Sequence, residues 1–192
     1  MIPDDRVDAA RTALLVIDVQ ERLFVAMDEA VRDHHLGRMI ALVGGARALQ
    51  MPILWTEQYP KGLGPTVGAL AEALVGSEPM APMVPMAKTT FSCLGDDTIR
   101  SAVAQTGRDQ WLVAGMETHI CVLQTVRDLL GAGHDVHVVA DACLSRSALD
   151  YGVGLDRAAS LGTHISSTET ALFDALGVAG GEAFKTISRL IR

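Results

Sequence analysis

The sequence has few aromatic residues and no excess of positive charge. Phe, Trp and Tyr make up 4% of the 192 residues, whereas 49% of the residues are hydrophobic. This composition favours helices packed closely against a sheet over an all-β sandwich. The formal net charge of −7 argues against a nucleic-acid-binding surface. A chain of this length can bury one substantial core, so we expect a single domain over residues 1–192.

Cysteines and long hydrophobic runs are also scarce. Cys93, Cys121 and Cys143 form no CxxC pattern, which argues against a disulfide scaffold or a dithiol redox motif. No stretch approaches the length that spans a bilayer, and the acidic start of the chain lacks the basic and apolar regions of a signal peptide. We therefore expect a cytoplasmic protein that has free thiols and no membrane partner.

Short apolar runs recur along the chain with helical patterns between them. Runs rich in Val, Ile and Leu that do not alternate with polar residues are typical of strands buried on both faces of a parallel sheet. The predicted strands are residues 12–17, 52–56, 83–86, 110–115, 135–140 and 163–166. The predicted helices are residues 36–50, 96–105, 120–130, 148–161, 166–176 and 182–191.

Strands that alternate with helices predict a doubly wound α/β fold. We expect three layers, with helices on both faces of a mostly parallel six-stranded sheet in the Rossmann-like order 3-2-1-4-5-6. Capping residues predict where two helices start. Thr118 is a candidate N-cap for the helix at 120–130, and Ser166 and Glu169 have the spacing of a capping box at the start of the helix at 166–176.

Three reactive side chains lie at the ends of predicted strands. Asp18 follows the first strand, Lys88 follows the third, and Cys121 lies near the start of the helix after the fourth. Ligands of such sheets bind beyond the carboxyl ends of the strands, and a helix N-terminus favours a thiolate over a thiol. Alone, each residue has another interpretation, as a turn cap, a solvated lysine or a small buried hydrophobe. Their coincidence at strand ends favours a catalytic site.

Several segments resemble a known enzyme family. The stretches LLVIDVQERLF, KTTFSCL and GMETHICVLQTVRDLL, at residues 14–24, 88–94 and 115–130, are similar to the three signature segments of isochorismatase-like cysteine hydrolases. Residues 56–66, 141–147 and 166–177 resemble the branch of that family called isochorismatase domain-containing proteins. The similar segments run along nearly the whole chain in the expected order.

The resemblance implies roles for the three reactive residues. Asp18 would act as general base and acid, Lys88 would support its charge, and Cys121 would attack a carbonyl carbon. The backbone amides of Glu117 and Cys121 would form the oxyanion hole. A cis peptide bond is expected between Met116 and Glu117. The resemblance also implies a homo-oligomer, a dimer or larger.

Departures from the family pattern narrow the chemistry. Nicotinamidases hold a metal with an Asp and paired histidines after the second strand, but residues 56–59 here are Thr, Glu, Gln and Tyr, and no histidine lies between His35 and His119. We therefore expect no metal and no cofactor, and the hydrolysis of an amide, imide or ureido-like C–N bond in a small molecule. His134 and His137 lie on opposite sides of a strand start and are expected to be structural.

Some residues near the predicted mouth of the site are candidates to contact the substrate, although capping or packing explains each equally well. They are Gln20, Phe24, Glu57, Tyr59, Phe91, Thr118 and His119. Two other functions remain open. The same fold could serve as a non-enzymatic binding or assembly protein, and Cys121 could be a redox sensor with Cys93 or Cys143 as resolving thiol.

Overall fold

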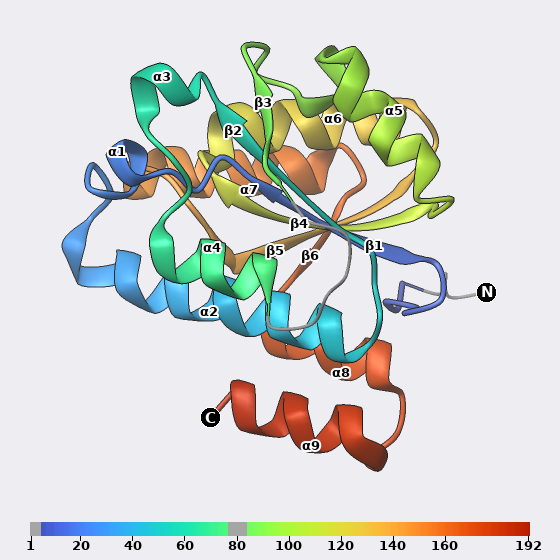
Figure 1. Ribbon diagram of the computed structural model, residues 1–192. Coiled ribbons are helices and arrows are strands. Elements are labelled where there is room, and N and C mark those ends of the chain that lie inside the picture. The colour runs from blue at the N-terminus through green and yellow to red at the C-terminus, as the bar shows by residue number, and fades with distance from the viewer. Residues whose placement is uncertain (1–4, 77–83) are drawn as a thin grey trace.

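The computed structural model describes residues 5–76 and 84–192. These residues form a six-stranded sheet in the order β3-β2-β1-β4-β5-β6, and all the paired strands are parallel. Figure 1 shows helices on both faces of this sheet. The predicted doubly wound fold and its strand order are therefore confirmed.

The strands are β1 (Thr12–Ile17), β2 (Ile53–Gln58), β3 (Met86–Lys88), β4 (Gln110–Met116), β5 (Asp135–Leu144) and β6 (His164–Ser166). The helices are α1 (Glu21–Phe24), α2 (Glu29–Ala48), α3 (Pro60–Leu63), α4 (Gly68–Val75), α5 (Asp97–Gln105), α6 (Leu123–Gly131), α7 (Ala148–Ser160), α8 (Thr168–Leu176) and α9 (Gly181–Leu190). A 3₁₀ turn, Cys93–Gly95, precedes α5, and a π-helical turn, Thr118–Val122, precedes α6.

Two hydrophobic cores lie on opposite faces of the sheet. One contains Leu14 and Val16 of β1 and packs under α2, α4, α8 and α9. The other contains Ala13 and Leu15 and packs under α5, α6 and α7. Alternate residues of one strand therefore enter different cores, which is why β1 and β4 are buried along their whole length and carry no alternating pattern. No helix in the described ranges is long and apolar enough to cross a membrane.

Several predicted boundaries were wrong. The third strand was expected at 83–86 but begins at Met86, where it pairs with Thr56 of β2; Met83 lies outside the described residues. The second strand continues to Gln58, which brings Glu57 into the sheet. The first long helix starts at Glu29 rather than residue 36, because Asp28 caps its N-terminus by accepting from the backbone of Ala30.

The cap of α8 was also misplaced by one residue. Ser167, not Ser166, is the N-cap, and its hydroxyl accepts a hydrogen bond from the backbone of Thr170 at 3.2 Å. Ser166 is instead the last residue of β6, where it pairs with Val139 of β5. Either of the two adjacent serines can cap a helix, and pairing of Ser166 with β5 leaves that role to Ser167.

Candidate active site

The three reactive residues converge at the carboxyl ends of neighbouring strands. Asp18 directly follows β1, Lys88 is the last residue of β3, and Cys121 lies in the π-helical turn after β4. Because β1 lies between β2 and β4 in the sheet, these ends meet at one edge of the sheet, where the strand order reverses. All three residues are buried, with exposed fractions of 0%, 3% and 6%.

Lys88 is held by a ring of oxygen acceptors. Its Nζ donates to Asp18 Oδ2 at 2.6 Å and to Gln58 Oε1 at 2.7 Å. The backbone oxygens of Thr90 and Phe91 lie at 3.2 and 3.1 Å. A buried ammonium group needs such partners to offset the loss of hydration. The sequence reasoning did not identify Gln58, although its position two residues after Thr56 in a parallel strand places it beside Lys88.

Asp18 has both carboxylate oxygens occupied. Oδ1 accepts from Thr56 Oγ1 at 2.7 Å, and Oδ2 accepts from Lys88. The backbone of Asp18 is in the left-handed region, with φ at 52°, which turns its side chain out of the β1 direction at the strand end. Thr56 is therefore a further positioning residue that the sequence reasoning missed, because its hydroxyl holds the orientation of the carboxylate.

The nucleophile candidate lies on an unusual turn. The peptide bond between Met116 and Glu117 is cis. The Glu117 carbonyl then accepts hydrogen bonds from the amides of Ile120 at 3.0 Å and Val122 at 3.2 Å. Thr118 was predicted as an N-cap, but its buried hydroxyl has no hydrogen-bond partner among the described residues, so that prediction was wrong. The first turn after β4 is π-helical, and regular α-helix starts only after Cys121.

The charge state of Cys121 differs from the sequence-based expectation. Burial raises the pKa of the thiol to about 12, and the negative charge of Asp18 and a hydrogen bond to it act in the same direction. Lys88 lowers the pKa but does not outweigh them. A helix N-terminus therefore does not suffice to produce a resting thiolate here. The raised pKa favours the protonated thiol at neutral pH, beside a carboxylate that can take its proton.

Two glycines allow the close approach of the elements around the site. Gly115 in β4 has φ of 127°, and a Cβ there would lie 2.1 Å from the backbone oxygen of Ile17. Gly154 in α7 faces the turn, and a Cβ there would lie 2.9 Å from the backbone nitrogen of His119. Any side chain at these positions would separate β4 from β1, or α7 from the turn that carries Cys121.

Two of the predicted substrate contacts brace the neighbouring loop instead. The Gln20 amide donates to the backbone oxygens of Gln58 and Gly64, at 3.1 and 2.7 Å, and it accepts from the Gln58 backbone. Glu57 Oε1 accepts from the backbone and hydroxyl of Thr66, at 2.7 and 2.8 Å. Both side chains are buried and hold residues 59–66 beside the crevice. Direct contact of either with a substrate stays a prediction.

The predicted aromatic contacts lie in different surroundings. Tyr59 and Phe91 are 55% and 54% exposed and flank Lys88, since Tyr59 donates its amide to the Lys88 carbonyl. Phe24 is half-buried, and the guanidinium group of Arg32 lies 5.5 Å from its ring centroid. Tyr59 and Phe91 are therefore placed to line the mouth, whereas Phe24 is engaged with α2.

Polar pairs also hold the far side of the turn. His119 Nδ1 lies 2.9 Å from Ser145 Oγ, just after β5. The Glu117 carboxylate accepts from Arg146 Nε at 2.9 Å and from the Arg146 backbone at 3.2 Å. These contacts tie the turn between β4 and α6 to the end of β5, so the backbone amides of Glu117 and Cys121 are carried by a braced segment.

Comparison with known proteins agrees with this geometry. The family model described as the isochorismatase domain matches residues 12–170. The chain is 35% identical over 187 residues to isochorismatase domain-containing protein 1 of Salmo salar, covering 95% of this chain but only 62% of that protein. The chain thus spans less than two thirds of the length of that relative.

Solved structures give the same picture. A structure of MAR1 ribonuclease from Caenorhabditis elegans is 32% identical, with a TM-score of 0.86, and the match covers 97% of this chain and 92% of that one. The YcaC gene product of Escherichia coli, described as an octameric hydrolase of unknown specificity, has a TM-score of 0.89 at 23% identity, over 100% of this chain and 91% of that one. With its matched domain and its doubly wound sheet, the chain belongs to the isochorismatase domain family.

Proposed function

We propose that the protein is a cysteine hydrolase that cleaves an amide, imide or ureido-like C–N bond of a small molecule through a covalent acyl-enzyme. One observation carries the proposal. Lys88 Nζ lies 2.6 Å from Asp18 Oδ2, both side chains are fully buried, and the same carboxylate is near enough to Cys121 to raise the pKa of its thiol. A buried cation, a carboxylate and a thiol in mutual contact have the parts of an activated nucleophile and its base.

The reaction follows from the protonated state of the thiol. As Cys121 Sγ bonds to the carbonyl carbon, Asp18 takes the thiol proton, and the carbonyl oxygen becomes an oxyanion. The oxyanion then collapses, the C–N bond breaks, and Asp18 returns the proton to the leaving nitrogen. A water molecule next attacks the thioester while Asp18 takes its proton, and the acid product leaves as the thiol is restored. Lys88 stabilises the carboxylate whenever Asp18 is ionised.

The turn after β4 supplies the oxyanion donors in this proposal. The amides of Glu117 and Cys121 lie at its start and near its end, and the turn is braced by Arg146 and Ser145. Donors held in advance at the position of the developing charge stabilise the transition state without reorganisation. The unpartnered hydroxyl of Thr118 on the same turn is a further candidate to bind the substrate.

The redox-sensor alternative has weaker support. Cys93, Cys121 and Cys143 are all buried, and burial raises the pKa of each thiol, to about 11 for Cys93 and about 12 for the other two. Sensor cysteines are exposed thiols of low pKa. The described geometry therefore supports a nucleophile that is activated when its base takes the thiol proton. It gives less support to a thiol that reacts with oxidants in solution.

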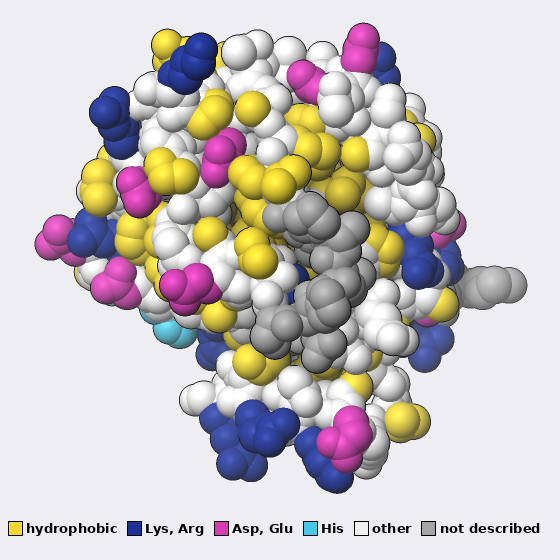
Figure 2. Space-filling model, in the orientation of Figure 1, with side chains coloured by type: hydrophobic (Ala, Val, Ile, Leu, Met, Phe, Trp, Pro, Cys, Tyr) yellow, Lys and Arg dark blue, Asp and Glu magenta, His cyan; other side chains and the backbone are white. Residues whose placement is uncertain are grey.

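Self-association is part of the same proposal. Figure 2 shows hydrophobic side chains gathered in the upper middle of the face that carries α1, α3, α4 and β3. Exposed hydrophobic residues on or beside these elements include Val25, Tyr59, Val75, Val84 and Phe91. Apolar patches on a surface are typical of interfaces. We propose a homo-oligomer, a dimer or larger, that acts in the cytoplasm, and its mass in light scattering would be at least twice the 20.4 kDa of the chain.

A hydrolysis screen tests the catalytic proposal. The purified protein would be assayed against small amides, ureides and cyclic imides, beside Cys121→Ala and Cys143→Ala. Both cysteines are buried, but the Cys143 thiol lies 3.9 Å from the Val113 backbone oxygen in β4 and is outside the triad. We expect activity in the parent and in Cys143→Ala, loss in Cys121→Ala, and a substrate adduct on Cys121 in intact-mass spectra. Full activity in Cys121→Ala would overturn the mechanism. If the parent hydrolysed none of the compounds, the result would favour a non-enzymatic role.

A further inference from the structure

Three potential metal ligands meet at the other end of the sheet. Asp135 and His137 are two residues apart in β5, so their side chains lie on the same face of the sheet. His164 in β6 is the register partner of His137, which places it beside His137 on that face. All three are at the amino ends of their strands, whereas Asp18, Lys88 and Cys121 are at the carboxyl ends.

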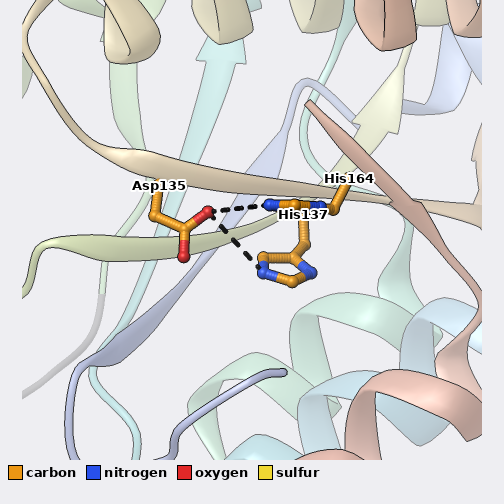
Figure 3. A group of neighbouring side chains, drawn as sticks. All are labelled: Asp135, His137 and His164. Carbon is orange, nitrogen blue, oxygen red and sulfur yellow. Dashed lines mark ion pairs between the residues drawn. The ribbon is translucent and has the colours of Figure 1, made fainter. Parts of the chain in front are cut away.

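The ligand atoms of these residues face one another. Figure 3 shows Asp135 Oδ1 directed at ring nitrogens of both histidines. The distances from Oδ1 are 3.8 Å to His137 Nε2 and 3.4 Å to His164 Nε2, and the ligand atoms of the group all lie within 4.8 Å of one another. Tetrahedral zinc with bonds of about 2.0 to 2.1 Å separates its ligand atoms by about 3.3 Å. Small side-chain rotations would bring the three atoms to that spacing.

Gln110 fixes the orientation of the carboxylate. Its Oε1 accepts from the Asp8 amide at 2.8 Å and from Thr12 Oγ1 at 2.6 Å, so its Nε2 must face the group. That nitrogen donates to Asp135 Oδ2 at 2.7 Å and to the Arg6 carbonyl at 3.0 Å. The same nitrogen also lies 3.3 Å from His137 Nε2, in a contact whose direction depends on the tautomer of the imidazole. Outer contacts of this kind orient metal ligands in proteins.

Burial and charge also suit a cation. The His137 side chain is 3% exposed, so little solvent competes with an ion at its ring nitrogen. Asp174 of α8 adds negative charge nearby. The side chains of Asp135 and His164 are 27% and 38% exposed, so an ion can enter from solvent and keep a water ligand.

We propose that Asp135, His137 and His164 form a binding site for a zinc ion that joins β5 to the edge strand β6. Two imidazoles and a carboxylate with one open position are a typical zinc donor set. The site lies at the opposite end of the sheet from Asp18, Lys88 and Cys121, and a bound ion would tie the edge strand β6, which is only three residues long, to β5. The sequence predicted no metal, because the ligands that nicotinamidases carry after the second strand are missing; the meeting of His164 with His137 depends on the pairing of β6 with β5.

Zinc titration of the metal-free protein tests the site. Every protein would carry Cys121→Ser, so that the candidate nucleophile cannot bind the ion. Calorimetry with Zn²⁺ would compare this parent with His164→Ala, Asp135→Asn and His134→Ala. His134 is the matched control, because it adjoins β5 but packs edge-on against Trp111, with ring centroids 6.1 Å apart. Co²⁺ would report the coordination geometry through its visible absorption, and thermal unfolding would be measured with and without Zn²⁺.

We expect one Zn²⁺ per chain, a rise of the unfolding midpoint with Zn²⁺, and the intense visible bands of four-coordinate Co²⁺. His164→Ala and Asp135→Asn should weaken Zn²⁺ binding by at least ~10-fold, because loss of a ligand costs no less than loss of an outer contact. His134→Ala should bind as the parent does. Equal affinity in all four proteins, or no saturable binding in the parent, would overturn the proposal. Asp135 and His164 are partly exposed, and circular dichroism checks that their variants are folded.

Discussion

At the scale of single residues, the central finding is that Cys121 rests as a protonated thiol. Burial and the charge of Asp18 raise its pKa to about 12, and Lys88 only partly opposes them. The carboxylate that suppresses the thiolate is the same group that is placed to accept its proton. Reactivity is thus expected when a substrate is present to accept the electrons of sulfur, and not in the free protein.

Replacing Asp18 should affect two reactions of Cys121 in opposite directions. In Asp18→Asn the negative charge is gone, so the pKa of the thiol falls and iodoacetamide should alkylate Cys121 faster at a given pH. Hydrolysis should fall by about 10²- to 10⁴-fold, because the general base is lost. In the parent, alkylation should accelerate as pH rises toward the high pKa. Peptide mass mapping of Cys121 over a pH series measures this.

Asp109→Asn serves as the control for that experiment, because this carboxylate is on the surface and bonds Arg11. It should leave both reactions unchanged. Slower alkylation of Cys121 in Asp18→Asn than in the parent would contradict the assignment of Asp18 as the group that raises the pKa.

The buried pair of Asp18 and Lys88 also bears on stability. Lys88→Met should lower the free energy of unfolding by about 3 to 5 kcal/mol, because it leaves the carboxylate buried without its cation. The double variant Asp18→Asn with Lys88→Met should lose less than the sum of the single variants. Urea unfolding measures these differences. Arg11→Ala, which breaks an exposed ion pair, should cause little change, and additive losses at the buried pair would refute strong coupling.

At the scale of elements, the site depends on the close packing of backbone segments. The turn Thr118–Val122 is in contact with α7, and Gly154 of α7 lies against the backbone of Thr118 and His119. Backbone atoms cannot rotate out of the way as a side chain can. The helix on one side of the sheet thereby helps to set the position of Cys121 relative to Asp18.

Two glycines of α7 provide a matched comparison. Gly154→Ala places a Cβ 2.9 Å from His119 N and Thr118 C, so we expect about 1 to 3 kcal/mol of destabilisation and a fall in turnover as the turn shifts. Gly152→Ala meets no atom within 4 Å and should stabilise the protein by about 0.4 to 1 kcal/mol, with turnover unchanged. Thermal unfolding and steady-state kinetics measure both. Equal behaviour of the two variants would contradict the close contact.

At the scale of the whole molecule, the charge distribution bears on the class of substrate. A relative of known structure is called a ribonuclease, yet this chain carries 23 acidic and 16 basic residues. Binding of a polyanion by phosphate contacts needs clustered Lys and Arg. The proposed substrate of this chain is therefore a small molecule.

An RNA assay separates these alternatives. We expect no cleavage of a fluorescent single-stranded RNA above the level of Cys121→Ala, and no binding in a filter assay at low salt, where electrostatic attraction is strongest. Saturable binding that weakens steeply with added salt would contradict this expectation.

The fold and the placement of three reactive residues at strand ends could be predicted from the sequence alone. Apolar runs such as residues 12–17 and 110–115 have no alternation because both sheet faces are covered, and this is visible without a structure. Reactive side chains that follow such runs come together because parallel strands end at one edge. Strand and helix boundaries were less accurate, because pairing with a neighbour decides where β3 starts and which of Ser166 and Ser167 caps α8.

The electrostatics of the site and the contacts between distant segments could be read only from the folded chain. The pKa of Cys121 depends on burial and on the distance to Asp18, neither of which local sequence specifies. The roles of Gln58 and Thr56 depend on β2 lying between β1 and β3, and the meeting of His137 with His164 depends on the register of β5 and β6. These properties come from residues far apart in the chain, and packing of the whole sheet is what brings them within reach of one another.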